Sequence, residues 1–524
     1  MGKTLSVNKT IAVASISLVI VSIFTNLISL LKEVIVAKCF GIGVSMDSYY
    51  SALTVPTMAG GIILSTFSIV FIPMLIKSLD DGINNSNKIA STAMNYFVVI
   101  FLGISLITFV FSEQIIRILF SGLSENIIWP AARILKILSL MLVFMGFSGI
   151  LTSVLNAYKI FFYPAVSQIM ITIGIIASVV LFQKGHNIYA IVWGYTAGII
   201  LQTFVLMYIL KKMGFRYTFS FETKYFKGNK LGKNILTFMI ISVAPSIVIL
   251  INRNMAAFLP AGSITALTYA EKIVQMPLTV FISSLPVVLY TYFSIQVSNN
   301  KIEELRNTLA LSIRMAAFVF IPIAVMIAFF SKQIVSILFQ RGNFTAEATE
   351  VTSKILFFYA FQLFSYYAAI IFSKLLFILN EYSRILKIIA ISIVLTVVGN
   401  ILFIRLLNPP AAGIALSSSC NILIIAVMFF VALKKSIGNI HGLEILKDVL
   451  KIAVFATISG FTAVITMRFL NSWNEGIIIY KILATSLSVL TGLAVYISLS
   501  LLFKLEEVYK IYNLVRDKIL QTVQ

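Results

Sequence analysis

The sequence predicts an all-α polytopic membrane protein with about fourteen transmembrane helices. The chain of 524 residues is 60% hydrophobic and 11% charged, and its mean hydropathy is +1.01. Soluble chains of this length do not have such a composition. The apolar stretches are continuous over the roughly 20 residues that a helix needs to cross a bilayer, whereas the strands of a membrane β-barrel alternate between apolar and polar residues.

Fourteen apolar stretches define the expected helices in chain order. The first is too long for the core of a signal peptide and has no small-residue cleavage site, so we expect it to be retained. Cys39 and Cys420 are the only cysteines, which excludes a disulfide framework and a cysteine metal site. The expected spans lie near residues 10–36, 48–77, 88–111, 130–157, 164–183, 188–210, 233–258, 265–296, 305–330, 347–379, 383–407, 411–433, 449–470 and 477–503.

The basic residues indicate the topology. The formal net charge is +21, and the longest polar connection, residues 211–233, holds seven basic residues against one acidic residue, Glu222. With an even number of spans this loop lies on the same side as both termini, and the positive-inside rule makes that side cytoplasmic. The basicity therefore reflects topology and contact with anionic membrane lipids, so no nucleic-acid partner is expected. Other basic stretches on the same side are 301–314, 384–387, 434–451 and 504–518.

An internal repeat organises the chain. The segment from Ser112 to Phe120 recurs from Ser331 to Phe339 with six of nine residues identical, at an offset of 219. Because each half then has six spans and starts on the same side, the two halves are expected to be related by an axis along the membrane normal. The expected domains are an N-terminal six-helix lobe at 1–211, a basic cytoplasmic linker at 212–232, a C-terminal six-helix lobe at 233–434, two extra helices at 449–503 and a cytoplasmic tail at 504–524.

Repeated halves in a membrane protein favour a transporter that works by alternating access, with its substrate site between the halves. The alternative is an old duplication in a protein that transports nothing. Two absences argue against an enzyme: the sequence has neither a Walker A loop nor a carboxylate-rich loop such as a membrane glycosyltransferase or hydrolase needs. His186 and His441 stand alone, so no metal ion or cofactor is expected.

Lys32 and Glu33 are the strongest candidate site residues. They follow 21 uncharged residues, from Ile11 to Leu31. A centred lysine costs roughly 2.5–3.5 kcal/mol on insertion, so a membrane helix that keeps such a pair usually directs it at a partner helix or a wet cavity. The alternative is that the span ends at Leu31 and that Lys32 only extends to the headgroups.

A second charged pair, Glu271 and Lys272, opens the apolar run of the eighth span, and Asp47 lies at the foot of the second. The repeat makes these two spans equivalent, so we expect them to face each other with the first span beside them. The two pairs would neutralise each other in an empty cavity, and the two lysines would attract an anionic ligand. Arg314 is a candidate gate residue; the alternative is an arginine at the headgroups.

Several blocks resemble the MurJ (MviN) lipid II flippases of the multidrug/oligosaccharidyl-lipid/polysaccharide exporter superfamily. The segment from Leu30 to Ala52 resembles the first-loop signature of that family. The likeness extends over nearly the whole chain, and the family also has fourteen spans. Supporting blocks are Leu155-Asn-Ala-Tyr158 with Pro164, Tyr269-Ala-Glu-Lys272 with Pro277, and Leu338-Phe-Gln-Arg-Gly-Asn-Phe-Thr345.

The resemblance implies two lobes around a cationic, alternating-access cavity and a groove for a lipid tail at the two extra helices. It makes Lys32 and Glu33 the counterparts of the family's cavity Arg–Asp pair and Lys272 the counterpart of a cavity arginine. Asp47 is the signature aspartate, and Thr265 is a further polar position of the eighth span.

The chain also departs from the family. A family arginine in the first span is Asn26, and an acidic position in the eighth span is Gln275. Family arginines of the second span are replaced by Gly60 and Gly61. Lysine keeps the charge of arginine but loses its bidentate fork. Some members bind sodium through carboxylates on the seventh and eleventh spans, which hold no Asp or Glu here.

These observations predict a flippase of the bacterial cytoplasmic membrane for a polyprenyl-diphosphate-linked saccharide, with lipid II for peptidoglycan synthesis as the leading substrate. Membrane lipids and the cell-wall synthesis machinery are its expected partners. A flippase for a capsule, teichuronic or exopolysaccharide unit is the nearest alternative. A cationic-drug exporter would need unpaired acids, and a polysaccharide polymerase would need a large outer loop. The sequence leaves the saccharide, the coupling ion and the oligomeric state open.

Overall fold

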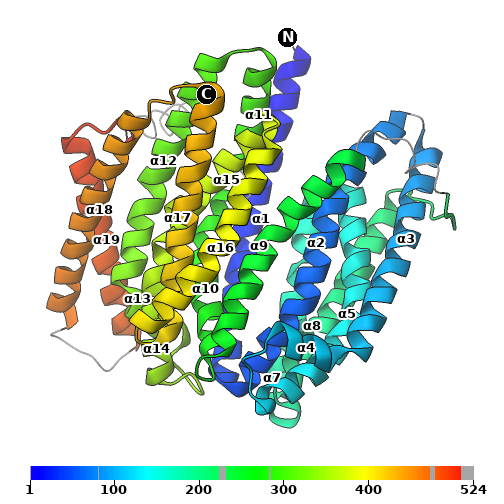
Figure 1. The fold of residues 1–524 in the computed structure, drawn as a ribbon, viewed down its shortest axis with the longest axis horizontal. Helices are drawn as coiled ribbons and strands as arrows, with labels where there is room; N and C mark the ends of the chain where they lie inside the picture. The colour runs from blue at the N-terminus through cyan, green and yellow to red at the C-terminus, as the bar shows by residue number, and fades with distance from the viewer. Residues whose placement is uncertain (1, 81, 223–231, 283–284, 472–477, 509–524) are drawn as a thin grey trace. The chain divides into compact units, whose positions relative to one another are not determined.

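The protein is built of α-helices. The computed structural model describes residues 2–80, 82–222, 232–282, 285–471 and 478–508, and within these ranges no β-strand occurs. Residues 223–231 of the predicted linker and 509–524 of the predicted tail lie outside the described residues. The helices are α1 Gly2–Phe40, α2 Val44–Asp80, α3 Ile83–Val110, α4 Ser112–Leu119, α5 Glu125–Ala157, α6 Phe162–Ser167, α7 Ile169–His186, α8 Tyr189–Lys212, α9 Gly232–Ala257, α10 Ser263–Ile282, α11 Leu285–Ser298, α12 Ile302–Phe329, α13 Ser331–Phe339, α14 Ala346–Ala360, α15 Gln362–Ile378, α16 Tyr382–Leu406, α17 Pro410–Ile437, α18 Gly442–Asn471 and α19 Ile478–Leu502 (Figure 1).

Many of these helices are long and apolar enough to cross a membrane. Within the described residues eleven segments meet this test, and α14 with α15, bent by 42°, brings the number to twelve. The polytopic all-α fold is therefore confirmed, while the count of fourteen stays a prediction. One reason for the difference is α10, which carries Glu271, Lys272 and Gln275 and is not one of the eleven segments.

The chain forms two compact units. Unit 1 contains Met1–Tyr269, Thr279–Ser284 and Arg341–Thr345, and unit 2 contains Ala270–Leu278, Leu285–Gln340 and Ala346–Gln524. These units follow contacts in space, whereas the predicted lobes follow the repeat, so the lobe boundaries stay a prediction. In unit 1 a core cluster from α2, α3, α5 and α8 includes Phe71, Phe101, Leu142 and Leu206.

In unit 2, α18 and α19 pack beside α12 (Figure 1). Phe455 and Tyr496 belong to one apolar cluster with Ala317, and Met326 belongs to a second with Ala463. The Tyr496 hydroxyl also donates a hydrogen bond to the Phe318 carbonyl at 3.0 Å. This last contact satisfies a polar group that would otherwise be costly to bury.

The helix boundaries recur at the offset of the sequence repeat. The helices α2 and α10 begin at residues 44 and 263, α3 and α12 at 83 and 302, and α4 and α13 at 112 and 331. The two members of each pair are separated by the same offset as the two copies of the repeated segment. This agreement supports an internal duplication, and the arrangement of two lobes about a common axis stays a prediction.

The helices α7 and α8 touch through their backbones. A Cβ added at Gly174, Gly194 or Gly198 would lie 2.5–2.7 Å from a backbone atom of the facing helix. Small residues let membrane helices approach this closely, so that packing and weak polar contacts hold them together. Gly413, the counterpart of Gly194 in the second half of the repeat, meets the backbone of Phe403 in the same way between α17 and α16.

We expect Gly194→Val to destabilise the protein, because the added side chain forces α7 and α8 apart; overpacking of this kind typically costs about 1–3 kcal/mol. The measurement is the melting temperature of the purified protein in detergent. Gly103→Ala is the matched control, because a Cβ at Gly103 meets nothing within 4 Å. Equal melting temperatures for the two variants would contradict this account of the α7–α8 contact.

Candidate functional site

Lys32 and Glu33 form a buried ion pair on α1 in unit 1. The distance from Lys32 Nζ to Glu33 Oε1 is 2.6 Å, and the side chains are 17% and 4% exposed. A lysine that merely extends to the headgroups would not share its charge with a carboxylate buried in the protein. A buried pair of this kind persists when further hydrogen bonds satisfy its remaining polar atoms.

Tyr50 of α2 supplies such a hydrogen bond. Its hydroxyl donates to Glu33 Oε2 at 3.3 Å. The Tyr50 ring meets the ring of Tyr269 edge to face, with 6.2 Å between the centroids, and Tyr269 meets Phe344 at 5.9 Å. All three aromatic side chains are buried. The ion pair therefore packs against a row of buried aromatic rings.

Asp47 binds the first turn of α10. Its Oδ2 accepts a hydrogen bond from the Gly262 amide at 2.6 Å, and its Oδ1 accepts from the amide and the hydroxyl of Thr265 at 2.9 and 2.6 Å. The first amides of a helix have no partner within the helix and carry a partial positive charge. The buried Asp47 carboxylate therefore caps α10 from another helix, and it does so with charge-assisted hydrogen bonds.

The loop Arg341–Thr345 lies against the end of α1. The backbone amide of Asn343 donates to the Lys38 carbonyl at 2.9 Å, and its side-chain amide donates to the Cys39 carbonyl at 2.5 Å. Gly41 and Gly342 both have positive φ angles, and a Cβ at either would collide with the backbone of the other segment. Glycine is required at this contact because only it permits both the conformation and the approach.

Two pairs of residues related by the repeat contact each other. Tyr50 and Tyr269 are equivalent positions of the two halves and meet ring against ring, and the equivalent glycines Gly43 and Gly262 also lie in contact. Contact between equivalent residues is typical of a two-fold relation, so these contacts favour the predicted pseudo-symmetry of the halves, which stays a prediction. Asp47 breaks this relation, because Ala266 stands at the equivalent position of α10.

Four further residues singled out in the sequence lie on α1 and α10: Asn26, Glu271, Lys272 and Gln275. Asn26 Nδ2 donates to the Thr279 hydroxyl at 2.7 Å, and Gln275 Nε2 donates to Glu271 Oε1 at 2.8 Å. Glu271 and Lys272 are partly buried and follow Tyr269 in the same helix. The mutual neutralisation of the two predicted Lys–Glu pairs stays a prediction.

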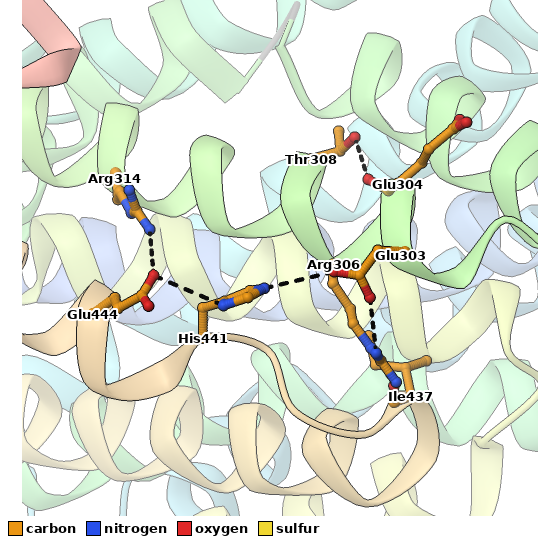
Figure 2. A network of polar contacts seen from close by, with 8 residues as sticks. All are labelled: Glu303, Glu304, Arg306, Thr308, Arg314, Ile437, His441 and Glu444. Carbon is orange, nitrogen blue, oxygen red and sulfur yellow. Dashed lines mark hydrogen bonds and ion pairs between the residues drawn. The ribbon is translucent and has the colours of Figure 1, made fainter.

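Arg314 lies in an ion-pair network of unit 2. Its guanidinium contacts Glu444 at 3.6 Å and Asp448 at 3.3 Å, both on α18. The network continues through His441 to Glu303 (Figure 2). The Nδ1 atom of His441 lies 3.7 Å from Glu444, and its Nε2 atom lies 3.8 Å from Glu303. These contacts join α12 to the start of α18. The sequence had suggested a gate residue or an arginine at the headgroups, and neither interpretation included this contact between α12 and α18. The gate role of Arg314 stays a prediction.

Two basic residues of the apolar helices, Arg253 and Lys374, were not predicted from the sequence as site residues. Arg253 of α9 donates from Nη1 to the Tyr50 carbonyl at 3.3 Å and to the Thr54 hydroxyl. Lys374 lies partly buried within α15. The signal was the same as for Lys32, a charge inside an apolar stretch, but neither residue stands beside an acidic neighbour in the sequence.

Within the part of the chain that the structure describes, no three residues of His, Cys, Asp and Glu are grouped so that they could hold a metal ion. Unit 1 offers one buried ion pair and a carboxylate at a helix N-terminus, and unit 2 contains Glu271 and Lys272 of α10. Lysine side chains at low dielectric suit the binding of an anion such as a phosphate. This arrangement suits recognition of a charged group more than bond-making chemistry.

A family comparison decides the identity of the fold. A sequence profile described as lipid II flippase MurJ matches residues 36–484. The chain belongs to the MurJ family. The resemblance found in the sequence is thereby confirmed, and with it a multi-pass protein of the bacterial inner membrane. Membership in this family of flippases also indicates transport rather than catalysis.

Relatives and solved structures agree with the MurJ assignment. The chain is 27% identical over 511 residues to the probable lipid II flippase MurJ of Buchnera aphidicola subsp. Schizaphis graminum, which covers 93% of this chain and 96% of that protein. A solved structure of the lipid II flippase MurJ in an inward closed conformation has a TM-score of 0.77 at 23% identity, covering 93% and 98% of the two chains. An inward-facing multidrug resistance MATE family transporter has a TM-score of 0.66 at 11% identity, covering 82% and 99%. These structural likenesses show a shared fold.

We expect Asp47→Asn to weaken the contact with α10. The asparagine side chain carries no charge, and it has an NH2 donor in place of one of the two acceptor oxygens. Loss of hydrogen bonds to a buried charged group costs about 1.5–3 kcal/mol each. The measurement is the melting temperature, with Thr265→Val as the partial variant that removes one hydrogen bond of the three. The account fails if Asp47→Asn is no less stable than Thr265→Val.

Proposed function

We propose that this chain translocates lipid II, a polyprenyl-diphosphate-linked saccharide, across the bacterial inner membrane by alternating access. The observation that carries the proposal is the match of the MurJ family over residues 36–484, which contains Glu271, Lys272 and Asp47. In the proposal Lys32, which pairs with Glu33 a few residues before the matched region, provides a positive charge for the diphosphate.

In the proposed mechanism, Lys32 and Lys272 receive the diphosphate. In the empty protein Glu33 neutralises Lys32 at 2.6 Å. The diphosphate competes with this carboxylate for the ammonium group, and the exchange gives the ligand a different interaction energy in the two states of the transporter. A ligand shifts a conformational equilibrium only by such a difference. The membrane potential, at about 2.3 kcal/mol per elementary charge per 100 mV, would act on any net charge that moves with the empty cavity.

The contacts around Asp47 are the proposed outer gate. With both termini in the cytoplasm, the turns at residues 41–43 and 258–262 and the loop Arg341–Thr345 belong to the outer face. These contacts join segments from the two halves of the repeat: Asp47 to Gly262 and Thr265, and Lys38 to Asn343. Release of substrate to the outside requires them to separate, and their polar character lets water replace them.

Several further parts of the proposal follow the family. The fourteen spans form two six-helix lobes, and α18 and α19 form a groove for the lipid tail. The packing of these two helices on α12 supports their role as an addition to the twelve-helix core. The cell-wall synthesis machinery, which consumes the translocated precursor, is the proposed partner. The chain performs no catalysis in this scheme.

We expect Lys32→Ala and Lys272→Ala each to abolish transport at near-normal expression, because these side chains bind the ligand. Lys→Arg should retain transport, since it keeps the charge and adds a bidentate fork suited to a diphosphate. Complementation of a strain depleted of its own flippase measures this. Lys301→Ala is the control, because Lys301 is exposed and pairs only with the neighbouring Glu304 among the described contacts. Full complementation by both alanine variants would refute the assigned sites.

A flippase for another diphosphate-linked saccharide is the second candidate function, and the missing cations favour it. Asn26, Gly60 and Gly61 add no charge to the two lysines. We therefore expect salt-sensitive binding with relaxed headgroup selectivity. Native mass spectrometry with lipid II, undecaprenyl diphosphate and a zwitterionic lipid measures it. Equal binding of all three would contradict diphosphate recognition, and strict selection of lipid II would contradict the relaxed selectivity.

A further inference from the structure

One face of α2 holds three different segments of unit 1. Asp47, Tyr50 and Thr54 follow one another at spacings of three and four residues, which places them on the same side of the helix. Asp47 binds the start of α10, the Tyr50 hydroxyl binds Glu33 of α1, and Thr54 accepts a hydrogen bond from Arg253 of α9. A displacement of α2 therefore affects all three contacts at once.

Arg253 is the unusual member of this set. It is the one charged residue among residues 240–257, a segment apolar enough to span a membrane. An arginine near the end of such a helix often extends to the headgroups. Here its Nη1 donates instead to the Thr54 hydroxyl and to the Tyr50 carbonyl at 3.3 Å, and Thr54 is only 1% exposed. The guanidinium is thus directed into the protein. A charged side chain inside a membrane span is costly, and for this reason it is a candidate functional residue.

Tyr50 connects Arg253 to the ion pair. Its carbonyl accepts from Arg253 and from the Thr54 hydroxyl, which donates at 2.7 Å, while its own hydroxyl donates to Glu33 Oε2 at 3.3 Å. Glu33 Oε1 faces Lys32 at 2.6 Å. Lys32 and Tyr50 therefore meet different oxygens of Glu33. As long as Oε2 is held by Tyr50, one oxygen is directed at Lys32.

We propose that Arg253 is a positioning residue for Lys32, acting through Thr54, Tyr50 and Glu33. An ammonium group has three donors. When Tyr50 holds one oxygen of Glu33, Lys32 keeps donors for a second anionic partner. When Tyr50 is displaced, both oxygens of Glu33 turn to Lys32 and compete with that partner. The inference rests on the proposed function, because the second partner is the diphosphate of the lipid substrate.

The test measures binding of undecaprenyl diphosphate to the full chain in lipid nanodiscs. Arg253→Met should weaken binding about tenfold, and Tyr50→Phe, which keeps the ring on Tyr269 and removes the hydroxyl, should weaken it by a similar factor. Arg253→Lys should retain most of the affinity. Arg405→Met is the matched control, since Arg405 is an exposed arginine near the end of α16, and it should bind as the unaltered protein does.

A thermodynamic cycle separates positioning from a merely structural role. If Arg253 acts through Lys32, Arg253→Met has no further effect in a Lys32→Ala background. An equal loss of affinity in both backgrounds would overturn the proposal. If Arg253→Met does not fold, Thr54→Val and Tyr50→Phe enter the same cycle, since both interrupt the same path.

The outcomes also separate this inference from the proposed function. If Lys32→Ala binds undecaprenyl diphosphate as tightly as the unaltered chain, the assignment of Lys32 to the substrate is wrong. If Lys32→Ala loses affinity while Arg253→Met and Tyr50→Phe do not, the substrate site stands and the positioning role is wrong.

Discussion

The carboxylate of Asp47 at the first turn of α10 is the interaction on which the described site depends. It places a full negative charge where the amides of Gly262 and Thr265 present a partial positive one, away from water. Such an interaction is strong because both partners would be costly to leave unpaired. By fixing the start of α10 against α2, it also fixes Tyr269, on which the aromatic row and the ion pair of Glu33 rest.

Duplication and asymmetry have separate roles in this arrangement. Tyr50 with Tyr269 and Gly43 with Gly262 show that equivalent residues of the two halves meet where α2 and α10 begin. The chemistry comes from positions that differ between the halves. Asp47 is matched by Ala266. In a symmetric contact each half would cap the helix of the other. Here only the first half supplies a carboxylate, so α2 caps α10 and α10 does not cap α2 through the equivalent residue.

The sequence predicted the features that local pattern determines. Apolar stretches of sufficient length gave the helices, the offset of the repeat recurs in the helix boundaries, and the uncharged run before Lys32 marked the ion pair. The position of Asp47 was predicted, but its binding to α10 was not, since Gly262 lies 215 residues away in the chain. For the same reason the contacts of Arg253 and of Arg314 were missed: each joins helices whose proximity no local pattern encodes.

The glycine contact between α7 and α8 has a mechanical consequence. At these glycines no side chain lies between the two backbones, so neither a rotamer change nor a side-chain rearrangement there can let α7 and α8 slide past each other. Neither contains a proline, whereas α9, α10 and α12 contain Pro245, Pro277 and Pro322, each of which removes a hydrogen bond within its helix. Sharp kinks in helices occur mostly at proline, so we expect α9, α10 and α12 to bend more easily than the pair of α7 and α8.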